Sequence, residues 1–209
     1  MNIVIIGASG RVGRHALEQA LAAGHTVTAA VRYRGAIEVR HPALSVVSCD
    51  VRNADEVCQA VAGHEAVIVA LGDPSRGPTD LYSTGARNTI AAMQEHGVRR
   101  LVFLSNFGVL GERAGDLVGA LLLMLVRRVI AYTLADHRLA LDAMRDWGGE
   151  WVAVRPMALD GGPRTGRYRV AIEGLPDRGR RVSRADVAEF MLEQATATEY
   201  LRSVPAIAY

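Results

Sequence analysis

The chain has 209 residues, half of them hydrophobic, and a formal net charge of +2 at pH 7. This length suits one domain of three layers, and the hydrophobic fraction excludes a disordered chain. So small a charge, with no basic run interleaved with aromatic residues, argues against nucleic-acid binding. All 24 basic residues are arginine, and the absence of lysine excludes any mechanism that needs a catalytic lysine.

The first predicted elements surround a glycine-rich turn. Residues 3–6 form a short apolar run rich in β-branched residues, which predicts a strand buried on both faces. The amphipathic stretch 11–23 predicts the helix that follows. Between and into these elements Gly7, Gly10 and Gly13 recur at three-residue intervals.

Each of these glycines has a physical reason to be there. Gly7 would make the tight turn, Gly10 would let the backbone approach a pyrophosphate, and Gly13 would let the helix pack on the strand. An ordinary glycine-rich turn is the alternative, but a strand before it and a helix after it favour dinucleotide binding. The predicted phosphate-binding residues are Gly7, Ser9, Gly10, Arg11, Val12 and Gly13.

Strands and helices alternate through the rest of the first three quarters. Further strands are predicted at Thr26–Val31, Leu44–Ser48, 66–71, 101–104 and 151–154, with helices at Ala54–Val61, Leu81–His96 and 137–147. This alternation predicts right-handed βαβ units and a doubly wound, mostly parallel α/β sheet of the Rossmann type. Ligands of such sheets lie beyond the carboxyl ends of the strands. The residues expected there are Gly7 to Gly13, Arg32, Asp50, Val51, Leu71, Gly72, Ser105 and Pro156.

An unusual apolar stretch covers residues 117–134. Its first ten residues are uninterrupted apolar sequence, and Arg127 and Arg128 follow. A membrane span needs about 20 apolar residues, so we expect no span here. A buried helix, a lid, a contact with a membrane surface and a homodimer interface through residues 117–134 all remain open.

The last fifty residues change in character. A loop rich in glycine and proline precedes a possible exposed strand at 167–173, and residues 185–195 predict an amphipathic helix. We find no linker and no repeat. We therefore expect one domain over residues 1–209, with a small C-terminal cap at about 157–184 forming one wall of a substrate pocket.

The residue after the second strand indicates which dinucleotide is bound. A protein that binds NAD usually has Asp or Glu there to accept the ribose 2′-hydroxyl. This chain has Arg32, with Arg34 just beyond, and a guanidinium can hold a 2′-phosphate. NADP is therefore the expected cofactor, unless Arg32 is a solvated surface residue. Asp50 and Val51 would lie beside the adenine.

Eight short motifs, in order, resemble a known family. They are GASGRVG at 7–13, VR at 31–32, CDV at 49–51, LG at 71–72, GARN at 85–88, LS at 104–105, VRP at 154–156 and SRADVA at 183–188. This set resembles the atypical short-chain dehydrogenase/reductase group, with its NmrA-like and biliverdin-IXβ reductase (flavin reductase) members. The resemblance covers nearly the whole chain and implies a Rossmann fold that binds NADPH across its strand ends.

The substrate half departs from that family. Alcohol-oxidising members use a Tyr-x-x-x-Lys pair, and Thr133 and His137 occupy the equivalent positions here. The serine that contacts substrate in the biliverdin-IXβ reductases aligns with Asn106, next to Ser105, and a pocket histidine of those enzymes aligns near Ala158. The resemblance therefore assigns the residues of the cofactor site well and those of the substrate site poorly.

The predicted function is an NADPH-dependent reductase that passes hydride to a conjugated small molecule such as a flavin, quinone or enone. Ser105, Asn106 and His137 are its candidate catalytic residues. A non-catalytic, redox-sensing NADP-binding regulator and a non-redox isomerase or cyclase remain open alternatives. No Gly-x-Ser-x-Gly elbow is present to support a hydrolase.

The remaining polar residues suggest no metal centre. No histidines are spaced as a ligand pair on a helix, and Cys49 and Cys58 should be reduced thiols of a cytoplasmic protein without a signal peptide. Asp136 and His137 could be an acid/base couple, but Asp136 is better explained as the N-cap of the following helix. Arg155 could meet an acidic substrate or be paired structurally with a carboxylate.

Overall fold

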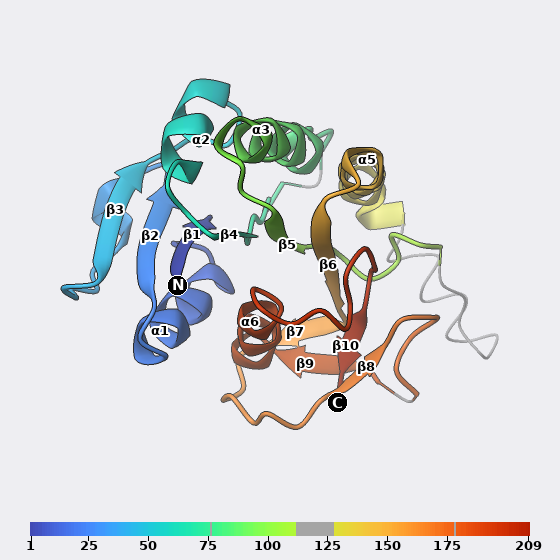
Figure 1. Ribbon diagram of the computed structural model, residues 1–209. Coiled ribbons are helices and arrows are strands. Elements are labelled where there is room, and N and C mark those ends of the chain that lie inside the picture. The colour runs from blue at the N-terminus through green and yellow to red at the C-terminus, as the bar shows by residue number, and fades with distance from the viewer. Residues whose placement is uncertain (76, 112–127, 178) are drawn as a thin grey trace.

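The computed structural model describes residues 1–75, 77–111, 128–177 and 179–209. Within them an eight-stranded sheet has the order β3-β2-β1-β4-β5-β6-β10-β8, and Figure 1 shows it at the centre of the molecule. Its strands are β1 (Asn2–Ile6), β2 (Thr26–Val31), β3 (Leu44–Ser48), β4 (Ala66–Val69), β5 (Arg100–Leu104), β6 (Glu150–Pro156), β8 (Arg169–Ala171) and β10 (Ala206–Ala208).

The neighbouring strands run parallel except for β8, which is antiparallel to β10. The order of β3 to β6 is that of a Rossmann fold, with the reversal between β1 and β4. The central strand β1 is buried on both faces from Ile3 to Ile6, as its continuous apolar sequence predicts. The predicted doubly wound α/β fold is therefore confirmed.

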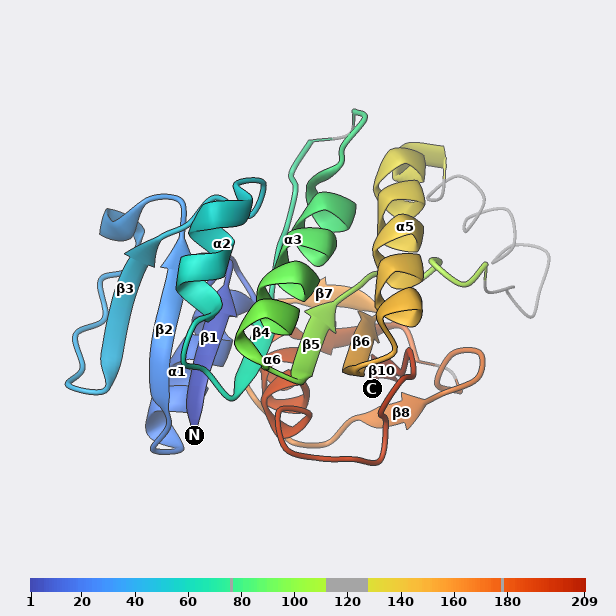
Figure 2. The ribbon, with the colours of Figure 1, turned by 45° about the horizontal axis from the view of Figure 1, so that its top comes forward.

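Helices cover both faces of the sheet. One face carries α1 (Gly13–Ala22) and α6 (Arg184–Glu193), which pack against each other, while α2 (Ala54–Val61), α3 (Leu81–His96) and α5 (Ala131–Trp147) lie side by side on the other. The two views in Figures 1 and 2 agree on this division. A short 3-10 turn, η1 (Arg34–Ala36), follows β2. Two hydrophobic clusters, one under each helical layer, form the core.

The C-terminal part adds two features that the sequence did not predict. A separate two-stranded parallel sheet joins β7 (Ala158–Asp160) to β9 (Arg181–Ser183). The chain then returns after α6 as β10, which pairs with β6 and is itself the partner of β8. Because β10 is only three residues long, its identity as a strand depends on the neighbours that it finds in the folded chain.

Buried polar side chains fasten this C-terminal cap. Arg155 is fully buried, and its guanidinium donates to the carbonyls of Val204, Ile172 and Gly174. Asp186 is also fully buried. Arg155 thus holds the loops around β8 and β10, rather than standing free to meet a substrate.

Asp186 gathers several donors at the start of α6. It accepts hydrogen bonds from the backbone of Thr165 and Gly166, from the Thr165 hydroxyl and from the Tyr209 hydroxyl. Burial alone would raise its pKa, but these hydrogen bonds outweigh burial and lower the pKa. Ser183 caps the same helix by accepting from the Asp186 N–H. The SRADVA motif therefore has a structural role, because it holds Thr165, Gly166 and Tyr209 against the start of α6.

Most of the apolar stretch 117–134 lies outside the described residues, which resume at Arg128. Within the part described, Val129 and Tyr132 are exposed, but a homodimer through residues 117–134 stays a prediction. No helix in the described ranges is long and apolar enough to cross a membrane.

Candidate functional site: a dinucleotide cleft at the carboxyl ends of the strands

The glycine turn after β1 has the geometry that its sequence predicts. Gly7 has a φ of +84°, and a Cβ there would lie 2.7 Å from the Ala70 carbonyl oxygen. At Gly13 a Cβ would lie 2.2 Å from the carbonyl oxygen of Gly7, a separation that no side chain tolerates. The tight turn at Gly7 and the close packing of α1 at Gly13 are thus confirmed.

The N-terminus of α1 lies at this turn, and of its first N–H groups that of Arg14 already donates to the Gly10 carbonyl. Its N-cap residue is Val12, whose side chain makes no capping hydrogen bond. The first N–H groups of a helix have no partner within the helix, and the helix dipole makes this end attractive to anions. The start of α1 therefore suits a phosphate group.

A cavity of about 120 Å³ lies at this turn, at the carboxyl ends of β1, β2 and β4. It brings together eight of the predicted cofactor residues, namely Gly7, Ser9, Gly10, Arg32, Asp50, Val51, Leu71 and Gly72. The predicted residues Arg11, Val12, Gly13, Ser105 and Pro156 do not line this cavity. The sequence did not assign a lining role to six further residues, namely Ile6, Ala30, Val31, Cys49 and Ala70, which lie within two residues of predicted ones, and Leu81, which begins α3.

Hydrogen bonds hold the Asp50–Val51 wall in place. The Asp50 N–H donates to Glu56, and the Asp50 carboxylate accepts from the Arg52 N–H. Asn88 of α3 donates its amide to the Val51 carbonyl at 2.9 Å. These contacts, which join two helices to the loop, fix the shape of the wall before a ligand arrives.

The two cysteines are free thiols, as expected. Cys49 is buried in the wall of the cavity, and burial, with Glu56 and Asp50 adding to it, raises its pKa to about 11. Because a neutral thiol is a poor nucleophile, Cys49 serves here as a small apolar lining residue.

Arg32 and Arg34 follow the end of β2 with exposed side chains. Arg32 also lines the cavity. It stands at the position where a protein that binds NAD usually has Asp or Glu. A guanidinium at this rim can make two parallel hydrogen bonds to a phosphate, whereas a carboxylate would repel it.

Ser105 and Asn106 leave the end of β5, where the Ser105 N–H donates to Val154 of β6. Ser105 is 5% exposed. Its hydroxyl oxygen and the Asn106 Oδ1 are buried and have no hydrogen-bond partner among the described residues. Buried polar atoms without partners are uncommon and costly, so these two are suited to meeting a ligand.

His137 lies in the interior of α5 and is 3% exposed. Its ring stacks on Tyr82, and Phe103 meets it edge-on with ring centroids 6.4 Å apart. Burial lowers the pKa of His137 to about 3, so the ring is neutral near pH 7. The His137 Nδ1 is another buried atom without a partner among the described residues.

The interpretation of Asp136 as the N-cap of its own helix is wrong. α5 begins at Ala131, so Asp136 lies within it. Its buried carboxylate accepts from the backbone N–H groups of Tyr82 and Ser83, at 2.8 and 3.2 Å, and so caps the start of α3. Residues 131–136 extend the predicted helix at its N-terminal end, which places Asp136 in the second turn of α5. The predicted type of contact, a carboxylate at a helix N-terminus, is correct, but the helix is α3.

The other residues aligned with family positions are spread around this end of the sheet. Pro156 is buried at the end of β6 and pairs with Ile207 of β10. Thr133 lies in α5, half-buried, and Ala158 begins β7 with its side chain exposed.

The model of the NAD(P)H-binding family matches residues 7–198. The chain belongs to this family. The match confirms the NAD(P)-binding part of the predicted resemblance, and a short-chain dehydrogenase/reductase from Veillonella parvula shares the fold.

A chloroplastic protein of Arabidopsis thaliana without an assigned function is 26% identical over 200 residues, which are 91% of this chain and 70% of that protein. An N-acetyl-alpha-D-glucosaminyl-diphospho-ditrans,octacis-undecaprenol 4-epimerase of Escherichia coli O157:H7 is 32% identical over 116 residues. That match covers 53% of this chain and 34% of the epimerase.

Among solved structures, a wide-type short-chain dehydrogenase/reductase from Veillonella parvula in complex with NADP has a TM-score of 0.80 at 20% identity. The match covers 100% of this chain and 94% of that one. At this identity the likeness shows the fold alone. The family match establishes that this chain is an NAD(P)H-binding protein, and its strand order is that of a Rossmann fold.

Proposed function

We propose that the protein is an NADPH-dependent reductase that transfers hydride to a conjugated, electron-poor small molecule, such as a flavin, a quinone or an enone. The observation that carries the proposal is the pair of buried polar atoms on Ser105 and Asn106 that have no hydrogen-bond partner among the described residues, at the end of a strand of the NAD(P)H-binding sheet. Groups that lack a protein partner are available to a bound substrate.

Several residues fit an NADP molecule. Gly7, Ser9 and Gly10 line the cavity beside the uncapped N-terminus of α1, where a pyrophosphate is favoured. Asp50 and Val51 form the wall expected beside an adenine. The exposed guanidinium of Arg32 supports NADP over NAD, because it can neutralise a 2′-phosphate.

Bound NADPH would supply the hydride, and the chain would supply orientation and a polar contact. Asn106 would hold the acceptor carbonyl through its amide. A 180° rotation of that amide puts the Nδ2 donor where Oδ1 now lies, at a position with no partner in the described part of the chain. Ser105 would position the carbonyl oxygen of the acceptor or the amide of the nicotinamide.

The chain offers little acid chemistry near this site. His137 is neutral and buried, and no lysine exists to assist a tyrosine. A conjugated acceptor suits such a site, because the negative charge that arrives with hydride is delocalised and water can protonate the product. A simple ketone, which needs a strong donor at the developing alkoxide, suits it poorly.

The test is turnover with a panel of acceptors. Purified protein is mixed with NADPH, and the loss of reduced-nicotinamide absorbance is followed with flavins, quinones, enones and simple ketones. Turnover of conjugated acceptors but not of simple ketones supports the proposal. Tight NADPH binding without turnover of any acceptor would contradict it and favour a redox-sensing regulator.

A second candidate is an isomerase on the same fold that makes no net redox change. The E. coli relative is a 4-epimerase, and such a reaction would move a hydride from a substrate carbon to NADP+ and return it to the other face of that carbon, so that the cofactor ends unchanged. Protein that isomerises a sugar nucleotide or related alcohol without consuming NADPH would favour this candidate.

A further inference from the structure

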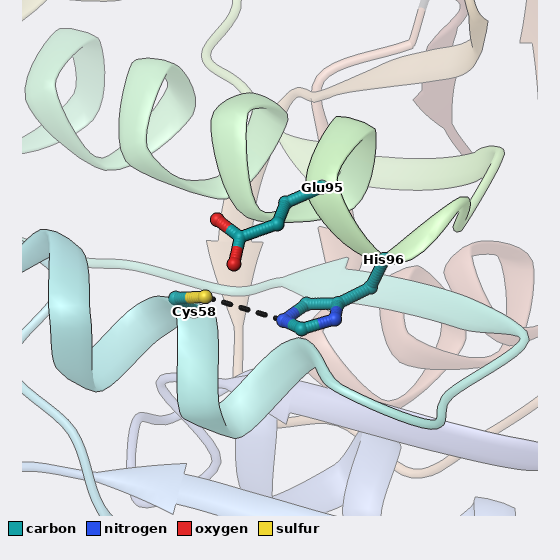
Figure 3. A group of neighbouring side chains, drawn as sticks. All are labelled: Cys58, Glu95 and His96. Atoms are coloured by element: carbon teal, nitrogen blue, oxygen red, sulfur yellow. Dashed lines mark hydrogen bonds between the residues drawn. The ribbon is translucent and has the colours of Figure 1, made fainter.

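A second cluster of chemically capable side chains lies outside the dinucleotide cleft. Cys58 of α2 and the last two residues of α3, Glu95 and His96, point toward one another across the contact between these helices (Figure 3). The Cys58 Sγ lies 3.2 Å from the His96 Nε2. One ligand atom from each of the three residues lies within 4.8 Å of the others.

These three groups are the usual ligands of one class of ion. Thiolate, imidazole and carboxylate together bind zinc and related borderline metals, whereas Mg²⁺ and Ca²⁺ prefer oxygen ligands alone. A tetrahedral zinc ion, with bonds of about 2.3 Å to sulfur and about 2.0 Å to nitrogen, holds the two ligand atoms roughly 3.5 Å apart. The observed sulfur–nitrogen separation needs only a small adjustment to reach that value.

The surroundings favour a cation and leave access to it. Cys58 is half-buried, while Glu95 and His96 are exposed. Asp55 lies three residues before Cys58 on the same helix, and such spacing places its carboxylate on the same face. The C-terminal end of α3 adds the negative end of a helix dipole.

We propose that Cys58, Glu95 and His96 bind one divalent ion of the zinc class and join α2 to α3. Binding would release the thiol proton to solvent, and water would fill the remaining coordination position. The role of such an ion is structural. Leu81, which lines the nucleotide cavity, is the first residue of α3, and His96 is the last. At about 1.5 Å per residue these ends lie about 22 Å apart.

Zinc titration of the untagged, chelator-treated protein tests the proposal. Calorimetry with zinc chloride should show one ion per chain with a dissociation constant in the micromolar range or below. Cys58→Ser and His96→Gln should each weaken binding at least tenfold, and Glu95→Gln should weaken it less. His41→Gln, at an exposed loop residue, is the matched control and should bind like the unaltered chain.

A thiol reagent gives a second readout. Cys49 is buried, so modification should report on Cys58, and zinc should slow it at least tenfold in the unaltered chain but not in His96→Gln. Unchanged circular dichroism and NADPH binding would show that the variants are folded. Absence of zinc binding by the unaltered chain, or equal binding by Cys58→Ser, would overturn the proposal.

Discussion

The imidazole of His137 stacks on the phenol ring of Tyr82, with ring centroids 3.8 Å apart and planes inclined by 27°. The family resemblance aligns His137 with a catalytic lysine. The structure instead encloses it between an aromatic ring and the core, where the charged form of the ring is costly. Two consequences follow, one for stability and one for catalysis.

The stability of the protein should fall in acid because of His137. Its pKa is about 3 in the folded chain and near 6.5 when unfolded. Below pH 6.5 the unfolded state therefore binds a proton that the folded state refuses, and the free energy of unfolding falls by up to about 1.4 kcal/mol per pH unit. Above pH 6.5 this effect disappears.

Urea unfolding at several pH values between 4 and 8 measures this contribution. His137→Phe keeps an aromatic ring against Tyr82 but cannot titrate, so its free energy of unfolding should depend less on pH in the acid range. His41→Gln, at an exposed position, serves as control. Parallel pH curves for His137→Phe and the unaltered chain would contradict the expectation.

Replacing Asp136 should destabilise the contact between α5 and α3. Asp136→Ala leaves the buried N–H groups of Tyr82 and Ser83 without an acceptor, at a cost of about 1–3 kcal/mol per group. Asp136→Asn retains one acceptor oxygen and should lose less. Asp142→Asn on the same helix, where the carboxylate is exposed beside Arg145, should change the free energy of unfolding little. Equal losses at positions 136 and 142 would refute the capping role.

Gly13→Ala should damage the fold at the dinucleotide turn. The new methyl group would lie 2.2 Å from the Gly7 carbonyl oxygen, so α1 must move away from the strand end. We expect the nucleotide affinity to fall at least tenfold, together with a lower melting temperature. Gly77→Ala is the matched control, since no atom lies within 4 Å of a Cβ there. Unaltered NADPH affinity in Gly13→Ala would show that the close packing is unimportant for binding.

Arg32 should decide the choice between the two cofactors. NADPH is expected to bind more tightly than NADH, by roughly 1.5–3 kcal/mol for each charge-assisted bond at most. Arg32→Ala should remove most of that difference and leave NADH binding nearly unchanged, while Arg40→Ala in an exposed segment should not. Fluorescence titration gives the dissociation constants. Equal affinities for NADPH and NADH in the unaltered chain would refute the assignment.

Turnover should depend on Asn106 more than on His137. With a working acceptor, Asn106→Ala should lower kcat by about 10²-fold, the usual effect of losing one oxyanion donor, without weakening NADPH binding. His137→Ala should have a smaller effect, because a neutral buried ring is a poor proton donor near pH 7. Loss of all turnover in His137→Ala, with NADPH binding intact, would make His137 the acid.

The sequence alone determined the Rossmann sheet and half of the cofactor site. Continuous apolar strands, amphipathic helices and the Gly7–Gly13 spacing are local patterns, and their physical requirements are the same in any surrounding. The carboxyl ends of parallel strands meet at one edge, so Gly7, Arg32, Asp50 and Gly72 were expected together before the fold was known.

Only the tertiary structure decided which distant residues meet. Asp136 caps a helix 54 residues away, and Cys58 meets His96 across 38 residues. β10 becomes a strand because β6 and β8 offer it partners. These contacts depend on how helices pack side by side and on the final register of the chain. No periodicity within one segment records that packing, because the energy that selects it comes from burial and hydrogen bonds between segments.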